Sequence, residues 1–263
     1  MVTECALGPA PAPVPPILPD AIHVWAFRLD ATGWRDRLRP EWLSADELAQ
    51  ARRLAREPLR RRFVMCRTTL RAILGRYLGR APAELTFALG PYGKPYLNAT
   101  RARGRLRFNV SHSDELALVA VSQRRELGVD LERVRPVDNI DDIVARSFTP
   151  AEQLAYHRTA PGDRLSAFYR YWTLKEAYLK ACGIGLSRAL AEIDVSRAED
   201  RLLRLPNAVG TPRDWRGRTL DPAAGYCGAL VVEGRAAVSL TMLGDCPLTV
   251  LALTESQPTV MAT

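Results

Sequence analysis

The chain has 263 residues, of which 47% are hydrophobic and 25% charged, and it carries a formal net charge of +8. This is the composition of a globular protein, long enough for one large domain or two small ones. No apolar run approaches the roughly 20 residues that span a bilayer, and prolines interrupt the N-terminus where a signal peptide needs an apolar core. We therefore expect a soluble, cytoplasmic protein with an anionic partner, whether nucleic acid, membrane surface, phosphorylated cofactor or acidic protein.

A proline- and alanine-rich lead opens the chain. Residues 8–19 have the composition of an extended, poorly ordered segment, and we assign residues 1–20 to this lead. The alternation of polar and apolar residues from Ile22 to Leu29 then predicts the first strand.

A long helical stretch is predicted between residues 44 and 78. It opens on Ser44-Ala-Asp-Glu47, which has the pattern of a capping box, and Pro58 should end or kink its first helix. Apolar residues at helical spacing in the second part predict a stripe that faces the core. These residues are Phe63, Leu70, Ile73, Leu74 and Tyr77.

Short strands are predicted for the middle of the chain. A turn at Pro91–Pro95 precedes them. The strand-like runs are 107–111, 116–121 and 127–131. The last two runs flank a polar break at Gln123–Glu126, so we predict a β-hairpin over residues 116–131.

One further helix and several strands complete the expected fold. The helix covers residues 164–181 and ends at Gly183. Strand-like runs return at 229–232, 236–242 and 248–253. Because helices and strands are mixed without βαβ order, the fold class is α+β rather than a doubly wound sheet.

Two carboxylates stand close together in Gly128-Val-Asp-Leu-Glu132. Side chains two apart on a strand point to the same face, so Asp130 and Glu132 should project side by side. Carboxylates held this close repel unless a cation or protons lie between them, and Mg²⁺ takes one or two carboxylates together with water and phosphate oxygens. A solvated strand face beside Arg133 is the alternative.

A third carboxylate lies in Trp172-Thr-Leu-Lys-Glu-Ala-Tyr-Leu-Lys180. On a helix, Glu176 and Lys180 are four apart and share one face. Taken alone, this pair is more simply an exposed salt bridge above aromatic core residues. The carboxylate could instead complete a metal site, with the lysine contacting the same phosphates.

The segment Phe108-Asn-Val-Ser-His-Ser113 surrounds His112 with polar side chains that could donate hydrogen bonds to a phosphate. Adjacent residues point apart on a strand, so Ser111 and His112 do not form a nucleophile–base pair. A lone histidine is more often structural.

The arginine clusters at 52–56 and 60–62 are mostly a solvated helix face. One or two of these arginines could clamp a phosphate bidentately.

Lysine is rare in this chain. Of its 37 basic residues only Lys94, Lys175 and Lys180 are lysines. A compact, rotatable ammonium and a planar guanidinium are not interchangeable where geometry matters. The first lysine lies in the turn at 91–95 and the other two lie in the segment 172–180, which favours geometric roles for all three.

The order of these motifs resembles that of the 4′-phosphopantetheinyl transferase superfamily, in particular the larger, monomeric kind that activates surfactin-type peptide synthetases. The motifs are Gly93-Lys-Pro95, Phe108–His112, Gly128–Glu132 and Trp172–Lys180 with Gly183–Leu186, and the resemblance covers about residues 44 to 190. It implies a pseudo-twofold arrangement of two similar halves, residues 21–126 and 127–263, with coenzyme A in the cleft between them.

The resemblance also implies roles for individual residues. Mg²⁺, or Mn²⁺ in its place, would be held by Asp130, Glu132 and Glu176. Coenzyme A would be contacted at its phosphates by Ser111, His112 and Lys180, at its adenosine end by Tyr92, Gly93, Lys94 and Pro95, and near its 3′-phosphate by Arg62. Glu47 and Gln50 stand where some members carry lysine, so Arg52 or Arg53 is expected to substitute there.

The implied reaction moves the pantetheine arm of coenzyme A onto a serine of an acyl or peptidyl carrier protein. Glu176, Lys180 and His112 are the expected catalytic residues, with Glu176 as the base. Carrier proteins are acidic, which suits the excess of arginine, and residues 137–148 should help to form the docking surface. No nucleic acid or membrane is expected as a partner. The rivals are a Mg²⁺-dependent nuclease and a basic nucleic-acid-binding module.

Overall fold

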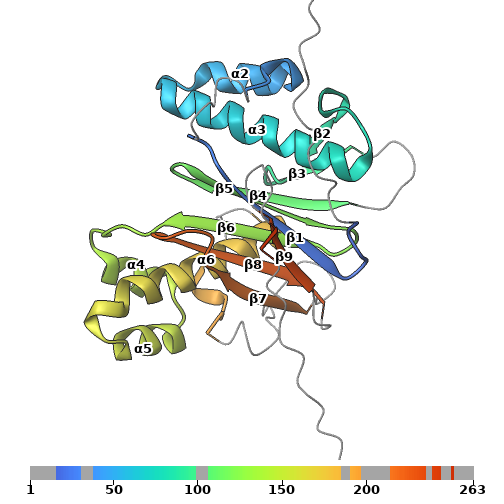
Figure 1. The fold of residues 1–263 in the computed structure, drawn as a ribbon. Helices are drawn as coiled ribbons and strands as arrows, with labels where there is room; N and C mark the ends of the chain where they lie inside the picture. The colour runs from blue at the N-terminus through green and yellow to red at the C-terminus, as the bar shows by residue number, and fades with distance from the viewer. Residues whose placement is uncertain are drawn as a thin grey trace, which may run out of the picture.

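The computed structural model describes residues 16–30, 38–98, 106–184, 190–196, 214–234, 239–243 and 250–251. The strands in these ranges form a five-stranded sheet, a three-stranded sheet and a two-stranded hairpin. Figure 1 shows the two larger sheets together in the middle of the molecule, with helices on their outer sides. Helices and strands are mixed without βαβ order, which confirms the α+β class. Most of the proline-rich lead lies outside the described residues.

The five-stranded sheet has the order β10-β9-β1-β5-β4. Its strands are β1 (Ala21–Arg28), β4 (Arg107–Ser113), β5 (Leu116–Ser122), β9 (Ser239–Leu243) and β10 (Val250–Leu251). The first strand was predicted, and it pairs antiparallel with β5 and parallel with β9. The C-terminal part of the chain therefore returns to the sheet that β1 begins.

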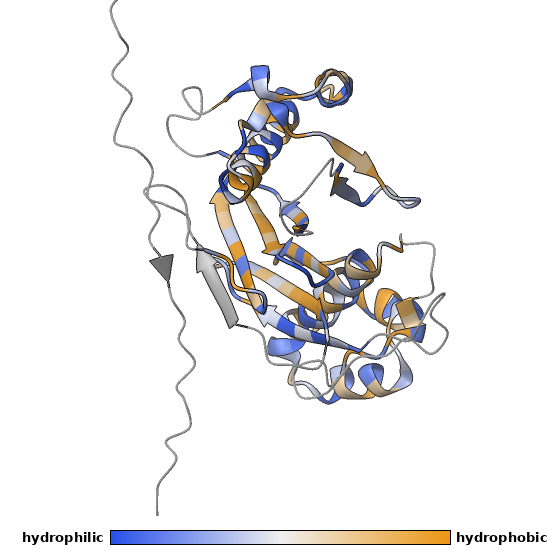
Figure 2. Ribbon diagram, turned by 90° about the vertical axis from the view of Figure 1, so that its right-hand side faces the viewer, coloured by the Kyte–Doolittle hydropathy of each residue, from blue (hydrophilic) through white to orange (hydrophobic). Residues whose placement is uncertain are grey.

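Strand β5 lies at the centre of two hydrophobic cores. Every one of its residues is buried, and alternate side chains belong to two different clusters of buried residues. One cluster joins the sheet to a helix, and the other joins it to the second sheet. Figure 2 shows the strands in the middle of the molecule largely in the hydrophobic colour, with the hydrophilic colour prominent on the helices.

The helices above this sheet are α2 (Ala45–Arg53) and α3 (Glu57–Leu78). The predicted capping box is present, with the Ser44 and Glu47 side chains each bonded to the other's backbone N–H. The break between the helices falls before Pro58, which lies in the first turn of α3. Proline lacks an N–H group that the first turn does not use, so Pro58 begins the second helix instead of ending the first.

The apolar stripe predicted on α3 is largely confirmed. Leu70, Ile73 and Leu74 are buried against the five-stranded sheet. Tyr77 is half-buried, and its hydroxyl lies 2.7 Å from Nδ1 of His23 and accepts a hydrogen bond from Trp25 Nε1 at 2.9 Å. Phe63 is only half-buried. The stripe fixes α3 on the sheet.

The three-stranded sheet has the order β6-β8-β7, with α6 (Arg164–Cys182) packed against it. Its strands are β6 (Leu127–Arg133), β7 (Trp215–Leu220) and β8 (Tyr226–Glu233). The remaining elements are α4 (Ile140–Ser147), α5 (Pro150–Arg158), the hairpin strands β2 (Phe87–Leu89) and β3 (Pro95–Leu97), and 3₁₀ turns at Pro40–Trp42, Pro82–Glu84, Pro161–Asp163 and Leu190–Glu192. The predicted helix end is confirmed, because Gly183 caps α6 with a φ of 65°.

The β-hairpin predicted over residues 116–131 is wrong. Strand β5 pairs with β1 and β4, whereas β6 pairs with β8 in the other sheet. The polar break at Gln123–Glu126 therefore carries the chain from one sheet to the next. Two apolar runs joined by a short polar segment fit either arrangement, and only the long-range partners of each strand decide between them. The division of the chain into halves at residue 127 stays a prediction.

A fully buried ion pair ties α5 and α6 together. Lys175 Nζ lies 2.7 Å from Glu152 Oε2, and both side chains are 0% exposed. The ammonium also donates to the carbonyl oxygens of Leu190 and Ile193, while the carboxylate accepts from the backbone N–H groups of Thr149 and Val195. Buried charges are tolerated when every donor and acceptor is satisfied in this way. The pair also holds the segment 190–195 in place.

Helix α6 and strand β6 approach each other closely at Gly128. A Cβ atom there would overlap the carbonyl oxygen of Ala177 and the backbone nitrogen of Ala181. These are backbone atoms of a helix and cannot move aside like the end of a side chain. Glycine at this position therefore sets the distance between the strand that carries Asp130 and the helix that carries Lys180.

Replacing Gly128 by alanine should lower the free energy of unfolding by about 3 kcal/mol, since overpacking against fixed backbone forces the helix and strand apart. Urea unfolding of Gly128→Ala measures this change. The matched control is Gly162→Ala, where a Cβ atom meets nothing within 4 Å and the expected change is below about 0.5 kcal/mol. Equal stability of the two variants would contradict the close helix–strand contact.

Candidate active site

The site lies where the edges of the two sheets meet. Strand β4 is at one edge of the five-stranded sheet, and β6 is at one edge of the three-stranded sheet. Side chains bridge the two strands: the Asn109 side-chain oxygen accepts a hydrogen bond from the Val129 N–H at 2.9 Å. Alternate residues of β4 point toward β6, which brings Ser111 and Ser113 to the carboxylates of the predicted acidic pair.

Asp130 is the most deeply buried of these carboxylates, at 3% exposure. Its Oδ1 accepts hydrogen bonds from Lys180 Nζ at 2.6 Å and from Ser111 Oγ at 3.1 Å. Lys180 also donates to Ser111 Oγ at 2.8 Å. Three residues predicted for one site, from β4, β6 and α6, thus form one hydrogen-bonded cluster.

Glu132 and Glu176 complete a group of three carboxyls around this cluster. Burial and the charge of Asp130 raise the pKa of Glu132 above its usual range. Burial, then the Asp130 and Glu132 charges, raise the pKa of Glu176 to about 7, although the nearby Lys180 ammonium acts in the opposite direction. The mutual repulsion expected from the sequence is therefore present, and it extends to the third carboxyl on α6.

Two oxygen atoms of this group are buried and have no hydrogen-bond partner, Oδ2 of Asp130 and Oε1 of Glu176. In the part of the chain that the structure describes, no group of three or more His, Cys, Asp or Glu side chains is arranged to hold a metal ion. Lys180 occupies the other oxygen of Asp130. Buried carboxylate oxygens without a hydrogen-bond partner are donors that a hard divalent cation takes. The chemistry of these donors therefore fits such an ion, although their arrangement here does not enclose one.

His112 and Arg62 lie near the cluster without joining its hydrogen bonds. The His112 side chain is exposed on β4, and its pKa is lowered by partial desolvation and by the positive charges of Lys180 and Arg62. Arg62 donates two hydrogen bonds to Oδ2 of Asp30, from Nε at 2.8 Å and from Nη2 at 2.6 Å. Asp30 was not expected from the sequence, because a lone aspartate at a strand end gives no signal.

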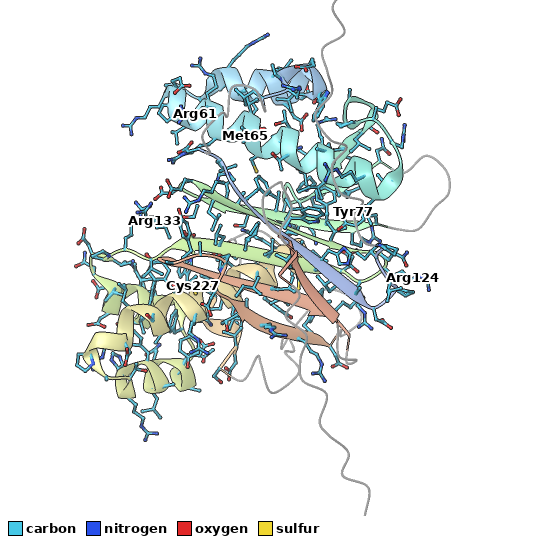
Figure 3. The ribbon with its side chains drawn as sticks, viewed as in Figure 1. Arg61, Met65, Tyr77, Arg124, Arg133 and Cys227 are labelled. Carbon is cyan, nitrogen blue, oxygen red and sulfur yellow. The ribbon has the colours of Figure 1, made fainter. Side chains whose placement is uncertain are left out.

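Further charged residues gather at the same end of the two sheets. Asp114, in the turn between β4 and β5, forms ion pairs with Arg133 and Arg135 and lies 3.9 Å from Arg62. Figure 3 shows Arg61 and Arg133 at this end of the molecule. Arg53, also predicted for the site, is exposed in the last turn of α2 and makes no ion pair within the described ranges. The structure thus brings Arg62, but not Arg53, into this charged group.

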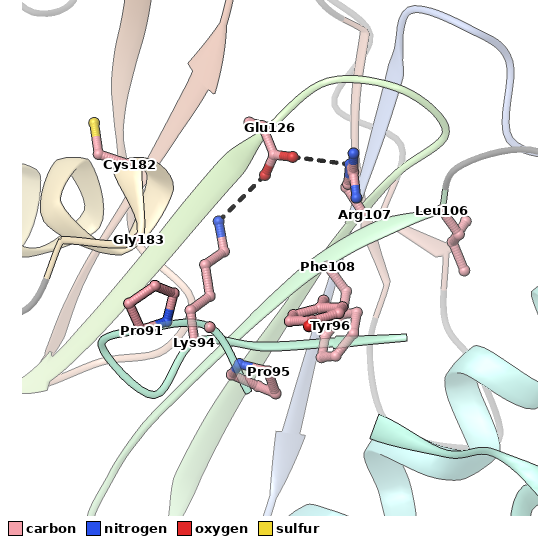
Figure 4. Close-up of a pocket in the computed structure, with 11 residues that line it drawn as sticks. Pro91, Lys94, Pro95, Tyr96, Leu106, Arg107, Phe108, Glu126, Cys182 and Gly183 are labelled. Atoms are coloured by element: carbon pink, nitrogen blue, oxygen red, sulfur yellow. Dashed lines mark hydrogen bonds and ion pairs between the residues drawn. The ribbon is translucent and has the colours of Figure 1, made fainter. Parts of the chain in front are cut away.

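A pocket of about 230 Å³ lies beside the turn between β2 and β3. Lys94 crosses it, and its ammonium lies 3.4 Å from the Glu126 carboxylate (Figure 4). The ammonium also donates to the carbonyl oxygens of Leu127 at 3.1 Å and Ala181 at 3.0 Å. Its ammonium therefore connects the turn to the start of β6 and the end of α6. Residues lining the pocket are Gly90, Pro91, Lys94, Pro95, Tyr96, Leu106, Arg107, Phe108, Glu126, Cys182 and Gly183.

Two of the residues predicted for this end behave differently from Lys94. Tyr92 is exposed at 59% at the tip of the turn, and Gly93 has a φ of 82° that suits glycine. Sequence reasoning missed Arg107 and Glu126, which form an ion pair at 2.9 Å across the pocket. Ordinary charged residues outside a motif carry no pattern that marks them as pocket residues.

Glu47 has a structural role. Its buried carboxylate forms ion pairs with Arg67 and with Arg71 at 2.7 Å, in addition to capping α2. Both guanidinium groups also lie over the ring of Phe87, at 5.1 Å and 5.0 Å. The position where some members of the resembled family carry lysine is therefore used here to fasten α2 and α3 together.

Comparison with known proteins decides the family. A sequence profile of the 4′-phosphopantetheinyl transferase superfamily matches residues 126–231. The 4′-phosphopantetheinyl transferase HetI of Nostoc sp. is 37% identical over 225 residues, which cover 84% of this chain and 93% of that protein. The chain belongs to the 4′-phosphopantetheinyl transferase superfamily. This confirms the family expected from the sequence and its reaction, transfer of the phosphopantetheine arm of coenzyme A onto a carrier protein.

Other relatives of this transferase span bacteria and eukaryotes. A phosphopantetheinyl transferase of Thraustochytrium sp. is 31% identical, with 83% of this chain and 81% of that protein covered. The 4′-phosphopantetheinyl transferase of Bacillus subtilis is 29% identical over 67% of this chain and 76% of its own length. Such long matches agree with the larger type of the family. No helix among the described residues is both long and apolar enough to cross a membrane.

Glu176 should make the metal-free transferase less stable as the pH rises. A carboxyl whose pKa is higher in the folded state keeps its proton longer there. The free energy of unfolding therefore falls as the pH rises from about 4.5, the ordinary pKa of the carboxyl, to about 7, its pKa in the folded protein. Glu176→Gln stays neutral and avoids this loss. In EDTA, we expect the variant to gain on the order of 2 kcal/mol over the wild type between pH 4 and pH 8, measured by urea unfolding.

The exposed Glu41 provides the control for this substitution. Its glutamine variant should follow the wild type across the same pH range. A difference between wild type and Glu176→Gln that does not change with pH would contradict the raised pKa of Glu176.

Proposed function

We propose that this transferase attaches the 4′-phosphopantetheine arm of coenzyme A to a serine hydroxyl of an acyl or peptidyl carrier protein and releases 3′,5′-ADP. The observation that supports the proposal is the cluster of Asp130, Ser111 and Lys180 between two sheet edges, with Glu132 and Glu176 beside it. An ammonium, hydroxyls and unsatisfied carboxylates in one place suit a pyrophosphate substrate.

Asp130, Glu132 and Glu176 would hold Mg²⁺, or Mn²⁺ in its place. When bound, the ion would supply positive charge that stabilises the pyrophosphate as it becomes a leaving group. The support for this role is the pair of buried, unpartnered oxygens on Asp130 and Glu176, together with the raised pKa values of Glu132 and Glu176.

Lys180, Ser111 and His112 would bind the phosphates of coenzyme A. Lys180 already contacts both Ser111 and Asp130, so its position does not depend on the substrate. The pocket beside Tyr92, Gly93, Lys94 and Pro95 would receive the adenosine end, with Phe108 and Tyr96 as apolar walls. Arg62 would release Asp30 and contact the 3′-phosphate in its place. Arg53, which is exposed, would be a further arginine that binds the phosphates of coenzyme A.

Glu176 would act as the general base. The carrier serine oxygen forms a bond to the β-phosphorus, its proton passes to the Glu176 carboxylate, and the bond from that phosphorus to the 3′,5′-ADP oxygen breaks. A base is most effective when its pKa lies near the working pH, and in the metal-free site burial raises the pKa of Glu176 to about 7. Lys180 on the next helical turn neutralises charge on the leaving phosphate.

The carrier protein would dock beside the end of β6, on residues 137–148. This segment contains α4, and α5 next to it exposes Leu154 at 54%. The net charge of +8 favours an acidic partner. The transferase would work as a cytoplasmic monomer, without nucleic acid or membrane.

The spacing of Glu176 and Lys180 argues against the alternative of a nuclease. A nuclease usually places its glutamate and lysine two apart on a strand, whereas Glu176 and Lys180 lie four apart on α6.

Incubation of an apo peptidyl carrier protein with the transferase, coenzyme A and Mg²⁺ should add one phosphopantetheine, detected by intact mass spectrometry. EDTA should lower the rate by at least about 100-fold because it removes the divalent ion. Asp130→Ala should lower it by a similar factor because the buried carboxylate at the centre of the cluster is lost. If an acidic carrier docks through opposite charges, its KM should also rise with salt, because salt screens that attraction. Asp163→Ala, at an exposed residue with no side-chain capping bond, should react like the wild type. No transfer to any of several acyl and peptidyl carriers would refute the proposal.

Glu176→Gln should lower kcat by about 100- to 10,000-fold, since general base catalysis typically contributes that much. The rate is measured as single-turnover transfer at saturating Mg²⁺. A separate measurement of Mn²⁺ binding shows whether the variant has lost the base or the ion. A variant that binds Mn²⁺ and keeps full turnover would remove Glu176 from the role of base.

A further inference from the structure

Ser113 is the last residue of β4 and bonds to β6 in two ways. Its Oγ accepts a hydrogen bond from the Arg133 N–H at 3.1 Å and donates one to Oε2 of Glu132 at 3.0 Å. A serine hydroxyl has one proton and two acceptor sites. Because the Arg133 N–H can only donate, the serine proton is directed to the carboxylate.

This arrangement repeats the one at Ser111. There the hydroxyl accepts from Lys180 Nζ and donates to Oδ1 of Asp130. Asn109, two residues earlier, accepts from the Val129 N–H. Alternate residues of β4 therefore bind β6 in step, and each of the two carboxylates on β6 receives one serine hydroxyl from β4.

We propose that Ser113 is a positioning residue that keeps the Glu132 carboxylate on the same face of β6 as Asp130, where it can join the other carboxylates in binding a divalent cation. This inference rests on the proposed metal-binding role of Asp130, Glu132 and Glu176. Ser113 itself touches neither the substrate nor the ion in this role. It acts by fixing the rotamer of Glu132, whose side chain would otherwise turn away from the charge of Asp130.

The physical reason lies in the repulsion between the two carboxylates. Asp130 is buried, and its charge acts on Glu132 two residues away. A flexible glutamate lowers this repulsion by rotating toward solvent, and it must then lose rotamer entropy when a cation binds. The hydroxyl of Ser113 is anchored to the backbone of β6 at Arg133, so it keeps the carboxylate in place before the ion arrives. Outer partners of metal ligands commonly contribute about 10- to 100-fold in affinity.

The test compares Ser113→Thr with Ser113→Val, because the two side chains have the same shape and differ in the hydroxyl. The probe is Mn²⁺ alone, and its dissociation constant is measured by the electron paramagnetic resonance signal of the free ion. We expect Ser113→Thr to bind Mn²⁺ within about twofold of the wild type and Ser113→Val to bind it about tenfold more weakly. Ser166→Ala, at an exposed serine on α6, is the control and should not differ from the wild type.

A double-mutant cycle identifies Glu132 as the residue through which Ser113 acts. In a Glu132→Gln background, replacing Ser113 by valine should cause no further loss of Mn²⁺ affinity. A merely structural role would lower affinity equally in both backgrounds. Thermal unfolding of each variant shows whether the fold is kept.

Three outcomes overturn the proposal. If Ser113→Val binds Mn²⁺ as tightly as the wild type, or loses the same affinity when Glu132 is glutamine, Ser113 does not position that carboxylate. If the wild type binds no Mn²⁺, the metal site falls and the role of Ser113 falls with it. Neither readout depends on phosphopantetheine transfer, so a failure here is distinguishable from an absence of transferase activity.

Discussion

The contact between the edge strands β4 and β6 is the constraint on which the site depends. The two strands belong to different sheets, and Asn109, Ser111 and Ser113 reach across from one to the other. Backbone N–H groups of β6 are thereby satisfied by side chains of β4 as well as by strand β8. Polar side chains of β4 can lie at this boundary because Asn109, Ser111 and Ser113 each find a partner on the opposite strand.

The charges at this boundary are balanced only in part. Lys180 neutralises one oxygen of Asp130, yet two buried oxygens lack a partner and the pKa of Glu176 is raised to about 7. Such an arrangement costs stability in the free protein and is characteristic of sites that bind an ion or move a proton. Gly128 makes this arrangement possible, because the absence of a side chain there lets α6 bring Glu176 and Lys180 close to β6.

The three lysines share a geometric role that explains why arginine does not replace them. Lys94 and Lys175 each bind two backbone carbonyl oxygens and one glutamate, and Lys180 binds a hydroxyl and a carboxylate. An ammonium directs its three donors outward from one point, whereas the donors of a guanidinium lie in a plane. The acceptors come from separate elements, so a compact ion reaches them where a flat fork would not. Geometric roles were expected from the sequence, but the acceptors were not.

The sequence by itself determined the capping box at Ser44, the core stripe on α3, the α+β class and the pairing of Asp130 with Glu132 on one strand face, because each of these depends on residues near one another in the chain. Only the tertiary structure decided that β5 and β6 lie in different sheets, that Glu47 fastens α2 to α3, and that Asp30, Glu152 and Ser113 have partners far along the chain. An isolated charged or hydroxyl residue has no periodicity that reveals its partner. Its role is set by which strand or helix packs against it, and that follows from burial of apolar surface across the whole molecule.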